Sequence, residues 1–275
     1  MRATRLALLA LVSPSALIAA PALAAAPLAP HRAVYDLVLD EASDKSGITG
    51  LSGRMVYEFN GSACEGYTVK FRFVTQIDTS ENSRVTDQQT TTFEDAEGKT
   101  FSFVTKSFTD QTLERELKGT ARREADGLKV DIDKPEPNSV ELERTQFPTQ
   151  HLVELIGKAN TGENFYETSV FDGSEDGDEV MTTTVVVGKK EPVEKSDPEA
   201  PVLAGLAKEK FWPVDIAYFD EATDGGEEVP EYRISFKLHE NGLTRDLVMD
   251  YGDFSMTGKL VNLALFDQAP QNCNQ

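Results

Sequence analysis

The chain has 275 residues, with 27 Lys and Arg against 47 Asp and Glu, and a formal net charge of −20. This charge excludes a nucleic-acid or anionic-membrane surface as the expected partner, because a polyanion repels such a chain. Hydrophobic residues make up 39%, including 15 Phe, which is enough for a core. No long apolar run lies outside the N-terminus, so neither a membrane-spanning protein nor a disordered acidic chain is expected. The length allows one large β domain or two smaller ones.

The N-terminus has the pattern of a secretory signal peptide. Arg2 and Arg5 precede the apolar stretch Leu6–Ile18, and Ala22-Leu23-Ala24 matches a small-x-small cleavage site. The alternative, a membrane anchor, is disfavoured because Ser13-Pro14-Ser15 interrupts the apolar run. We predict export with cleavage near Ala24, which gives a signal peptide over residues 1–24 and a single β domain over residues 25–275.

Two cysteines, Cys64 and Cys273, lie in the exported part, where an oxidising compartment lets disulfides persist. One bridge is therefore expected, and it would close a loop of about 210 residues, which the chain-entropy model values at roughly 5 kcal/mol. The alternative is a redox-active pair. Such pairs normally have Cys-x-x-Cys spacing, which is absent here. We interpret the pair as a structural staple.

From Val34 onward the dominant hydrophobic period is two, which is typical of strands with one buried face. In Tyr67–Ile77 the apolar residues alternate with polar ones, and Tyr232–Leu238 repeats this pattern. About a dozen antiparallel strands are predicted, too many for one flat sheet, so coiling or closure is expected. The other predicted strands are Ala33–Asp40, Arg54–Phe59, Val85–Glu94, Thr100–Phe108, Leu113–Arg122, Leu128–Asp133, Asn164–Phe171, Val180–Val187, Asp215–Phe219, Leu243–Tyr251 and Lys259–Phe266.

Val85–Glu94 differs from the other predicted strands because it is polar on both faces, which predicts a strand that extends into solvent or lies on a charged edge. Asn241-Gly242 predicts a tight turn between two strands. Hairpin turns are also predicted at Asn60-Gly61, Asp126-Gly127 and Asp224-Gly225-Gly226.

One helix is predicted after Thr149, which could cap it. Its apolar stripe would cover or plug the sheet, and consists of Leu152, Leu155, Ile156 and Ala159. A shorter helical turn is expected at Val202–Lys208. The charged, proline-bearing segment Lys189–Glu199 between them is interpreted as an exposed loop.

The common catalytic motifs are missing, namely Gly-x-Ser-x-Gly, the P-loop, His-Glu-x-x-His and Gly-x-Gly-x-x-Gly. His31, His151 and His239 lie at no metal-ligand spacing and are interpreted as surface residues. We therefore expect no enzymatic activity, no metal site and no cofactor. Asp172–Glu179 resembles the opening of a calcium loop, but Thr183 stands where the loop needs a bidentate Glu. A tight acidic hairpin turn is the favoured interpretation.

Three stretches together carry a family resemblance. They are His31–Leu37, Gly53–Phe59 and Gly61–Tyr67, the last of which contains Cys64, with Cys273 near the C-terminus. This chain resembles the EipB family of cell-envelope integrity proteins of alphaproteobacteria. The resemblance implies a soluble periplasmic protein, a spiral-like half-barrel of antiparallel strands similar in shape to the lipoprotein carriers LolA and LolB, the Cys64–Cys273 disulfide, and a role in keeping the envelope intact under stress.

Two functional hypotheses follow. The favoured one is a non-enzymatic periplasmic scaffold that binds another envelope protein, for example one with helical repeats of the TPR type, through its acidic surface. The alternative is a carrier for a lipid or for the acyl chain of a lipoprotein. Its candidate apolar ligand face is Phe71, Phe73, Ile234 and Phe236, although a filled β core requires the same residue types. A hydrolase ranks third, because the sequence reveals no acid pair.

Overall fold

A computed structural model describes residues 28–174, 176–220, 229–267 and 273. It consists mainly of one antiparallel sheet of 15 strands, of which β8 and the two-residue β11 were not predicted from the sequence. The strands are β1 (His31–Ala42), β2 (Ile48–Ser62), β3 (Gly66–Thr79), β4 (Ser83–Glu94), β5 (Thr100–Thr109), β6 (Thr112–Arg123), β7 (Leu128–Lys134), β8 (Asn138–Leu142), β9 (Phe165–Val170), β10 (Met181–Val187), β11 (Glu191–Pro192), β12 (Lys210–Asp220), β13 (Tyr232–His239), β14 (Thr244–Asp250) and β15 (Phe254–Leu265).

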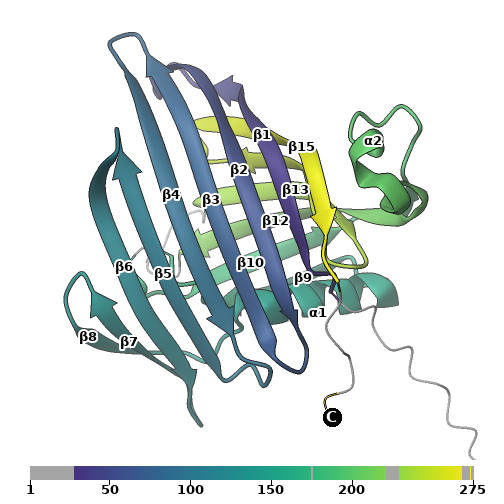
Figure 1. Ribbon diagram of the computed structural model, residues 1–275. Coiled ribbons are helices and arrows are strands. Elements are labelled where there is room, and N and C mark those ends of the chain that lie inside the picture. The colour runs from purple at the N-terminus through teal and green to yellow at the C-terminus, as the bar shows by residue number, and fades with distance from the viewer. Residues whose placement is uncertain (1–27, 175, 221–228, 268–272, 274–275) are drawn as a thin grey trace, which may run out of the picture.

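The sheet is open, and its strand order is β8-β7-β6-β5-β4-β3-β2-β1-β15-β14-β13-β12-β10-β9. It curls so that β1–β6 form one wall and β9–β15 form a second wall behind it, as Figure 1 shows. At the ends of the sheet, β8 and β9 do not pair with each other. The residues before the helix reach β9 through a single bridge between Gln146 and Val170. The predicted half-barrel of antiparallel strands is confirmed.

Local turn chemistry accounts for most hairpins. The turn at Asn241-Gly242 is confirmed, and Gly242 adopts φ +88° between β13 and β14. Asp126-Gly127 joins β6 to β7, where the Glu124 N–H donates to the carbonyl of Gly127 at 2.9 Å. The predicted turn at Asn60-Gly61 is wrong, because both residues lie within β2 and the chain turns at residues 63–65. The predicted turn at 224–226 lies outside the described residues.

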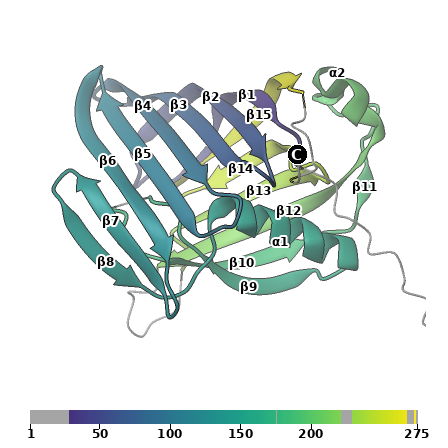
Figure 2. The same ribbon diagram turned by 60° about the horizontal axis from the view of Figure 1, so that its bottom comes forward.

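The predicted covering helix is α1 (Pro148–Thr161), which lies across the space between the two walls at one end of the half-barrel (Figure 2). Leu155, Ile156 and Ala159 are buried in the main core as expected. The expected cap is wrong: Thr149 lies inside the helix, and its N–H donates to Oε2 of Glu94 at 2.9 Å. A carboxylate at the end of β4 therefore caps the helix from a distant part of the chain.

The segment after β10 carries two short helices, α2 (Ala200–Leu203) and the 3-10 helix η1 (Ala204–Lys208), near the predicted helical turn. The preceding loop is largely exposed as predicted, but the expectation is wrong for Glu199, which is only 2% exposed. In the part of the chain that the structure describes, no helix has both the length and the apolar character needed to cross a membrane.

The buried side chains form two clusters. The larger one lies between the walls beneath α1 and includes Tyr35, Trp212 and Leu238. The second consists mainly of residues of β5–β7 together with Phe147 and Phe171, which flank α1 and β9. Phe171 packs edge-on against Phe101 and Phe103, with ring centroids 6.1 and 5.7 Å apart. This second cluster covers the gap between the two free edges of the sheet.

Candidate functional site

The two walls do not pack completely against each other, and the space between them contains a cavity of about 280 Å³. We call it the apolar chamber. Most of its lining is aliphatic or aromatic and comes from β1–β4 and β13–β14, with one further tyrosine after β14. The lining residues are Tyr35, Met55, Tyr57, Phe71, Phe73, Gln88, Ile234, Thr244, Leu247, Met249 and Tyr251.

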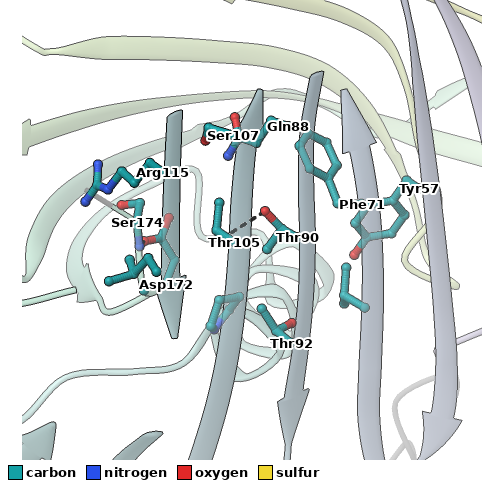
Figure 3. A pocket seen from close by; sticks show the side chains of 14 residues that line it. Tyr57, Phe71, Gln88, Thr90, Thr92, Thr105, Ser107, Arg115, Asp172 and Ser174 are labelled. Atoms are coloured by element: carbon teal, nitrogen blue, oxygen red, sulfur yellow. Dashed lines mark hydrogen bonds between the residues drawn. The ribbon is translucent and has the colours of Figure 1, made fainter. Parts of the chain in front are cut away.

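A second cavity of about 450 Å³, the polar chamber, adjoins the first, since Tyr57, Phe71 and Gln88 line both. Figure 3 shows its labelled side chains around one space, with hydroxyl and amide groups of β4 and β5 in the centre and Arg115 and Asp172 at one side. The remaining lining residues are Val69, Thr90, Thr92, Thr105, Ser107, Leu117, Pro148, Gly173 and Ser174. The half-barrel thus holds a cavity that changes from apolar to polar across its width.

The polar character of β4 has a different cause from the one expected. The strand is not at an edge: it pairs with β3 from Ser83 onward and with β5 from Thr86 onward. Only its first residues, at the β3–β4 hairpin, are exposed in succession. Thr90 pairs with Phe71, and Gln88 pairs with Phe73, so the inward face of this strand forms the polar wall of the cavity.

The two ends of the half-barrel differ. The end near the start of β1 is covered by α1. At the other end, where Phe254 pairs with Ala42, a row of aromatic rings crosses the inner face of four neighbouring strands. Tyr218 stacks on Tyr232 at 4.2 Å between ring centroids, Tyr232 lies 6.1 Å from Tyr251, and Tyr251 lies 5.1 Å from Phe254. Tyr251 also lines the apolar chamber, so this row borders the chamber on the side away from α1.

Of the four side chains predicted to form an apolar ligand face, Phe71, Phe73 and Ile234 line the apolar chamber. Phe236 does not line it and is buried in the main core with 7% exposure. Sequence reasoning missed Tyr57, which is contributed by β2 and lines both chambers. Burial raises the pKa of Tyr57 to about 12, so its hydroxyl is neutral at physiological pH.

The acidic segment Asp172–Glu179 joins β9 to β10, but it is a longer loop than the expected tight turn and packs over the second core cluster. Gly173 lies against the ring of Phe103, and Asp176 forms an ion pair with Arg115 at 2.5 Å. Within the described residues, which omit Glu175, no group of three or more His, Cys, Asp or Glu side chains could hold a metal ion. The loop closes the polar chamber on the side of Arg115.

The interpretation of the three histidines as surface residues is wrong, because His31, His151 and His239 are 3%, 6% and 0% exposed. Burial lowers the pKa of each, and that of His239 falls to about 4 through burial and the neighbouring charge of Arg245. Nε of Arg245 lies 3.0 Å from Nε2 of His239. The three histidines lie outside both chambers. His239 and Arg245 belong to a buried polar network.

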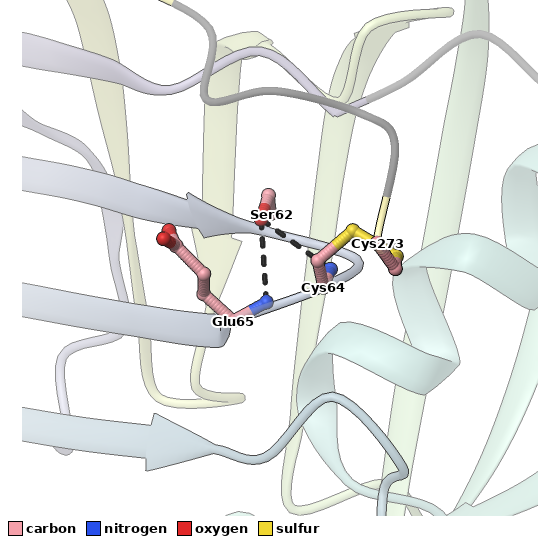
Figure 4. Close-up of a disulfide and its surroundings, with 4 residues drawn as sticks. All are labelled: Ser62, Cys64, Glu65 and Cys273. Carbon is pink, nitrogen blue, oxygen red and sulfur yellow. Dashed lines mark hydrogen bonds between the residues drawn. A yellow bond between two sulfur atoms is a disulfide. The ribbon is translucent and has the colours of Figure 1, made fainter. Parts of the chain in front are cut away.

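The Cys64–Cys273 disulfide is present, with the two Cα atoms 5.1 Å apart. Figure 4 shows that Cys64 lies in the turn between β2 and β3, where Ser62 Oγ accepts the N–H groups of Cys64 and Glu65 at 3.3 Å each. The bridge therefore attaches residue 273 to the hairpin that carries Phe71 and Phe73. This placement fits the structural staple that the spacing predicted.

Comparison with known proteins places the chain in a family. Residues 22–267 match the EipB-like family. The chain belongs to the EipB-like family. Its similarity to the cell envelope integrity protein EipB of Brucella abortus is 59% identity over 252 residues, which covers 90% of this chain and 88% of the relative. The crystal structure of a β-barrel-like protein of unknown function from Brucella abortus superposes with a TM-score of 0.85 at 57% identity, covering 88% of this chain and 100% of that one.

Proposed function

We propose that this EipB-like protein supports the integrity of the cell envelope from the periplasm, without an enzymatic reaction, by holding the acyl chain of a lipid or lipoprotein. The observation that carries the proposal is the apolar chamber between the two walls. Its volume of about 280 Å³ lies near the lower end of the range for small-molecule sites. The predicted export signal and the name of the Brucella relative support the location and the envelope role.

The main objection to a carrier function is that a filled β core also requires inward-facing aromatic side chains. The apolar chamber removes this objection. Phe71, Phe73 and Ile234 are only half-buried, whereas Phe236 and Leu238 are buried in the core. Burial of apolar surface is worth roughly 25 cal/mol per Å², so a chain that covers these side chains would bind without any charged contact.

The experiment is native mass spectrometry of the mature protein isolated gently from periplasm, followed by organic extraction. We expect one acyl-bearing molecule per protein. Ile234→Trp fills the chamber and should remove the added mass, while Val38→Trp, which adds the same bulk at an exposed position of β1, should retain it. A bare protein that also fails to take up an apolar fluorophore would refute the carrier.

The envelope role is tested separately in cells. A strain that lacks the gene should become sensitive to detergent and regain resistance with the wild-type protein or Val38→Trp. Ile234→Trp, if present at normal levels, should not restore resistance. Full rescue by this variant would show that the envelope role does not depend on the apolar chamber.

A second candidate function, binding of another envelope protein, is favoured by one observation. Phe165 and Val186 are 61% and 47% exposed and pair with each other across β9 and β10, at the end of the sheet. Exposed apolar residues beside a sheet edge are typical of contact surfaces. A photo-crosslinking residue at position 165 should capture one periplasmic protein, and a crosslinker at exposed Thr91 should not. Identical capture from both positions would count against it.

A further inference from the structure

The polar chamber suggests which part of a ligand lies beside the acyl chain. Along the inner face of the sheet, the lining changes abruptly from β3 to β5. Phe71 pairs with Thr90, which pairs with Thr105 on the next strand. Phe73 pairs with Gln88, which pairs with Ser107. Since neighbouring strands are about 4.8 Å apart, the change from rings to hydroxyl and amide groups takes place within roughly 10 Å.

Gln88, Thr90, Thr105 and Ser107 form a polar strip on the inner face of β4 and β5. The packing of the fold does not explain this strip. The inward face of a half-barrel sheet is normally apolar, as it is on β1, β3 and β13 of this protein. The hydroxyls of Thr90 and Thr105 hydrogen-bond to each other at 3.0 Å (Figure 3). Because each hydroxyl has one donor and two acceptor positions, this single bond leaves capacity for a ligand.

The charges beside the strip disfavour an anionic head group. Arg115 is paired with Asp176 at 2.5 Å, and a second carboxylate, Asp172, lines the chamber. Asp172 Oδ1 accepts the N–H of Ser174 at 2.8 Å. A phosphate or carboxylate placed here would meet two acidic groups and one guanidinium that is already paired, so an anionic group would be repelled.

We propose that the polar chamber binds the neutral, hydroxyl-bearing head group of an amphiphile, such as a glyceryl or sugar group, whose acyl chain lies in the apolar chamber. This inference rests on the proposed carrier function and adds the ligand class. A hydroxyl group both donates and accepts hydrogen bonds, and Thr90, Thr105, Ser107 and Gln88 offer both roles in return.

The test compares ligands that share one lauryl or lauroyl chain: monolauroylglycerol, lauryl glucoside, lauryl phosphate and lauryl trimethylammonium. Their affinities are measured by displacement of an apolar fluorophore from the delipidated full-length mature protein. We expect at least one of the two neutral ligands to bind about tenfold more tightly than lauryl phosphate, as expected for two hydrogen bonds. Tighter binding of lauryl trimethylammonium, whose head group can neither donate nor accept a hydrogen bond, than of both neutral ligands would overturn the inference. The glycerol and sugar probes distinguish the two sources of neutral head group.

Variants test whether the preference for neutral ligands comes from the polar strip. The double variant Thr90→Val and Thr105→Val keeps the side-chain shape and β-branching, and should lose most of the preference while still binding the fluorophore. Ser107→Ala is a second test should the double variant fail to fold. Thr91→Val on the outer face of β4 is the matched control and should behave as wild type.

The two proposals fail in different ways. If the fluorophore does not bind, or binds equally to Ile234→Trp, the carrier function is wrong. If Ile234→Trp abolishes fluorophore binding but lauryl phosphate binds as tightly as the neutral ligands, only the head-group inference is overturned. The same holds if the Thr90→Val, Thr105→Val variant and Ser107→Ala both keep the full preference.

Discussion

Glu199 contacts the side chain of Arg245 and, at the same time, the backbone of β14 and β15. Its Oε2 lies 2.9 Å from Nη1 of Arg245, and its Oε1 accepts the N–H groups of Asp246 and Leu260 at 3.1 and 2.7 Å. β14 and β15 pair only between Leu247–Asp250 and Ser255–Gly258, so these N–H groups lie just beyond the pairing. A side chain from the α2 segment thus replaces the backbone partners that the two strands lack where they separate.

We therefore predict that Glu199→Ala lowers the free energy of unfolding by about 3–5 kcal/mol, because it leaves the guanidinium of Arg245 buried with one acidic partner fewer. Arg245 is 0% exposed, and its other carboxylate partner is Asp197 at 2.8 Å. Urea unfolding measures the change. Glu194→Ala, at an exposed position in the same segment, is the control and should change stability by less than about 0.5 kcal/mol. An equal effect of the two variants would contradict this role of Glu199.

Mild acid should destabilise the protein through His239. Its pKa is lowered to about 4 by burial and by Arg245, whereas an unfolded His titrates at about 6.5. Between these values the unfolded chain binds the proton and the folded protein does not, so stability falls as the pH drops from about 6.5 to about 4. The expected loss is roughly 3 kcal/mol.

Urea unfolding at pH 7.5 and pH 5 would measure this effect. His31 and His151 also have lowered pKa values and add to the slope, so the informative quantity is the difference between wild type and His239→Gln. The variant should have a shallower pH dependence. Equal slopes for the two proteins would show that His239 titrates normally.

Loss of the disulfide should destabilise the protein substantially. The bridge spans 209 residues of sequence, and the chain-entropy model gives a contribution of about 5 kcal/mol for a loop of this length. We predict that Cys64→Ala combined with Cys273→Ala lowers the melting temperature, as does a reductant on the wild type. Reductant should have no further effect on the double variant. Unchanged melting of the variant would mean that the bridge only secures the C-terminal residues.

Gly173 is required by close packing. Its φ is +71°, and a β-carbon added there would lie 2.6 Å from Cγ of Phe103. Gly173→Ala should therefore destabilise the fold by about 1–3 kcal/mol through strain and overpacking. Gly157→Ala, on an exposed position of α1 with open space around it, should be neutral or stabilising. Thermal melting of both variants checks the contrast, and an equal response would contradict it.

The sequence predicted features that depend on neighbouring residues. The period of two in Tyr67–Ile77 and the Asn241-Gly242 turn both correspond to observed elements. The sequence did not predict contacts between residues that lie far apart in the chain. Glu94 caps α1 from a position 55 residues before Thr149, and a local cap signal cannot include such a partner. The polar pattern of Val85–Glu94 is visible in the sequence, but only the pairing with Phe71 and Phe73 shows that it faces a cavity.

The pairing of β1 with β15 places the first strand of the chain in the middle of the sheet, beside the last one. When the chain emerges with its N-terminus first, β1 can pair with β2, but its other edge stays unpaired until residues 254–265 have emerged. An unpaired edge invites association with other chains, and contacts between distant residues form slowly. The order of the strands thus makes late folding intermediates the stage at which this protein most needs protection from aggregation.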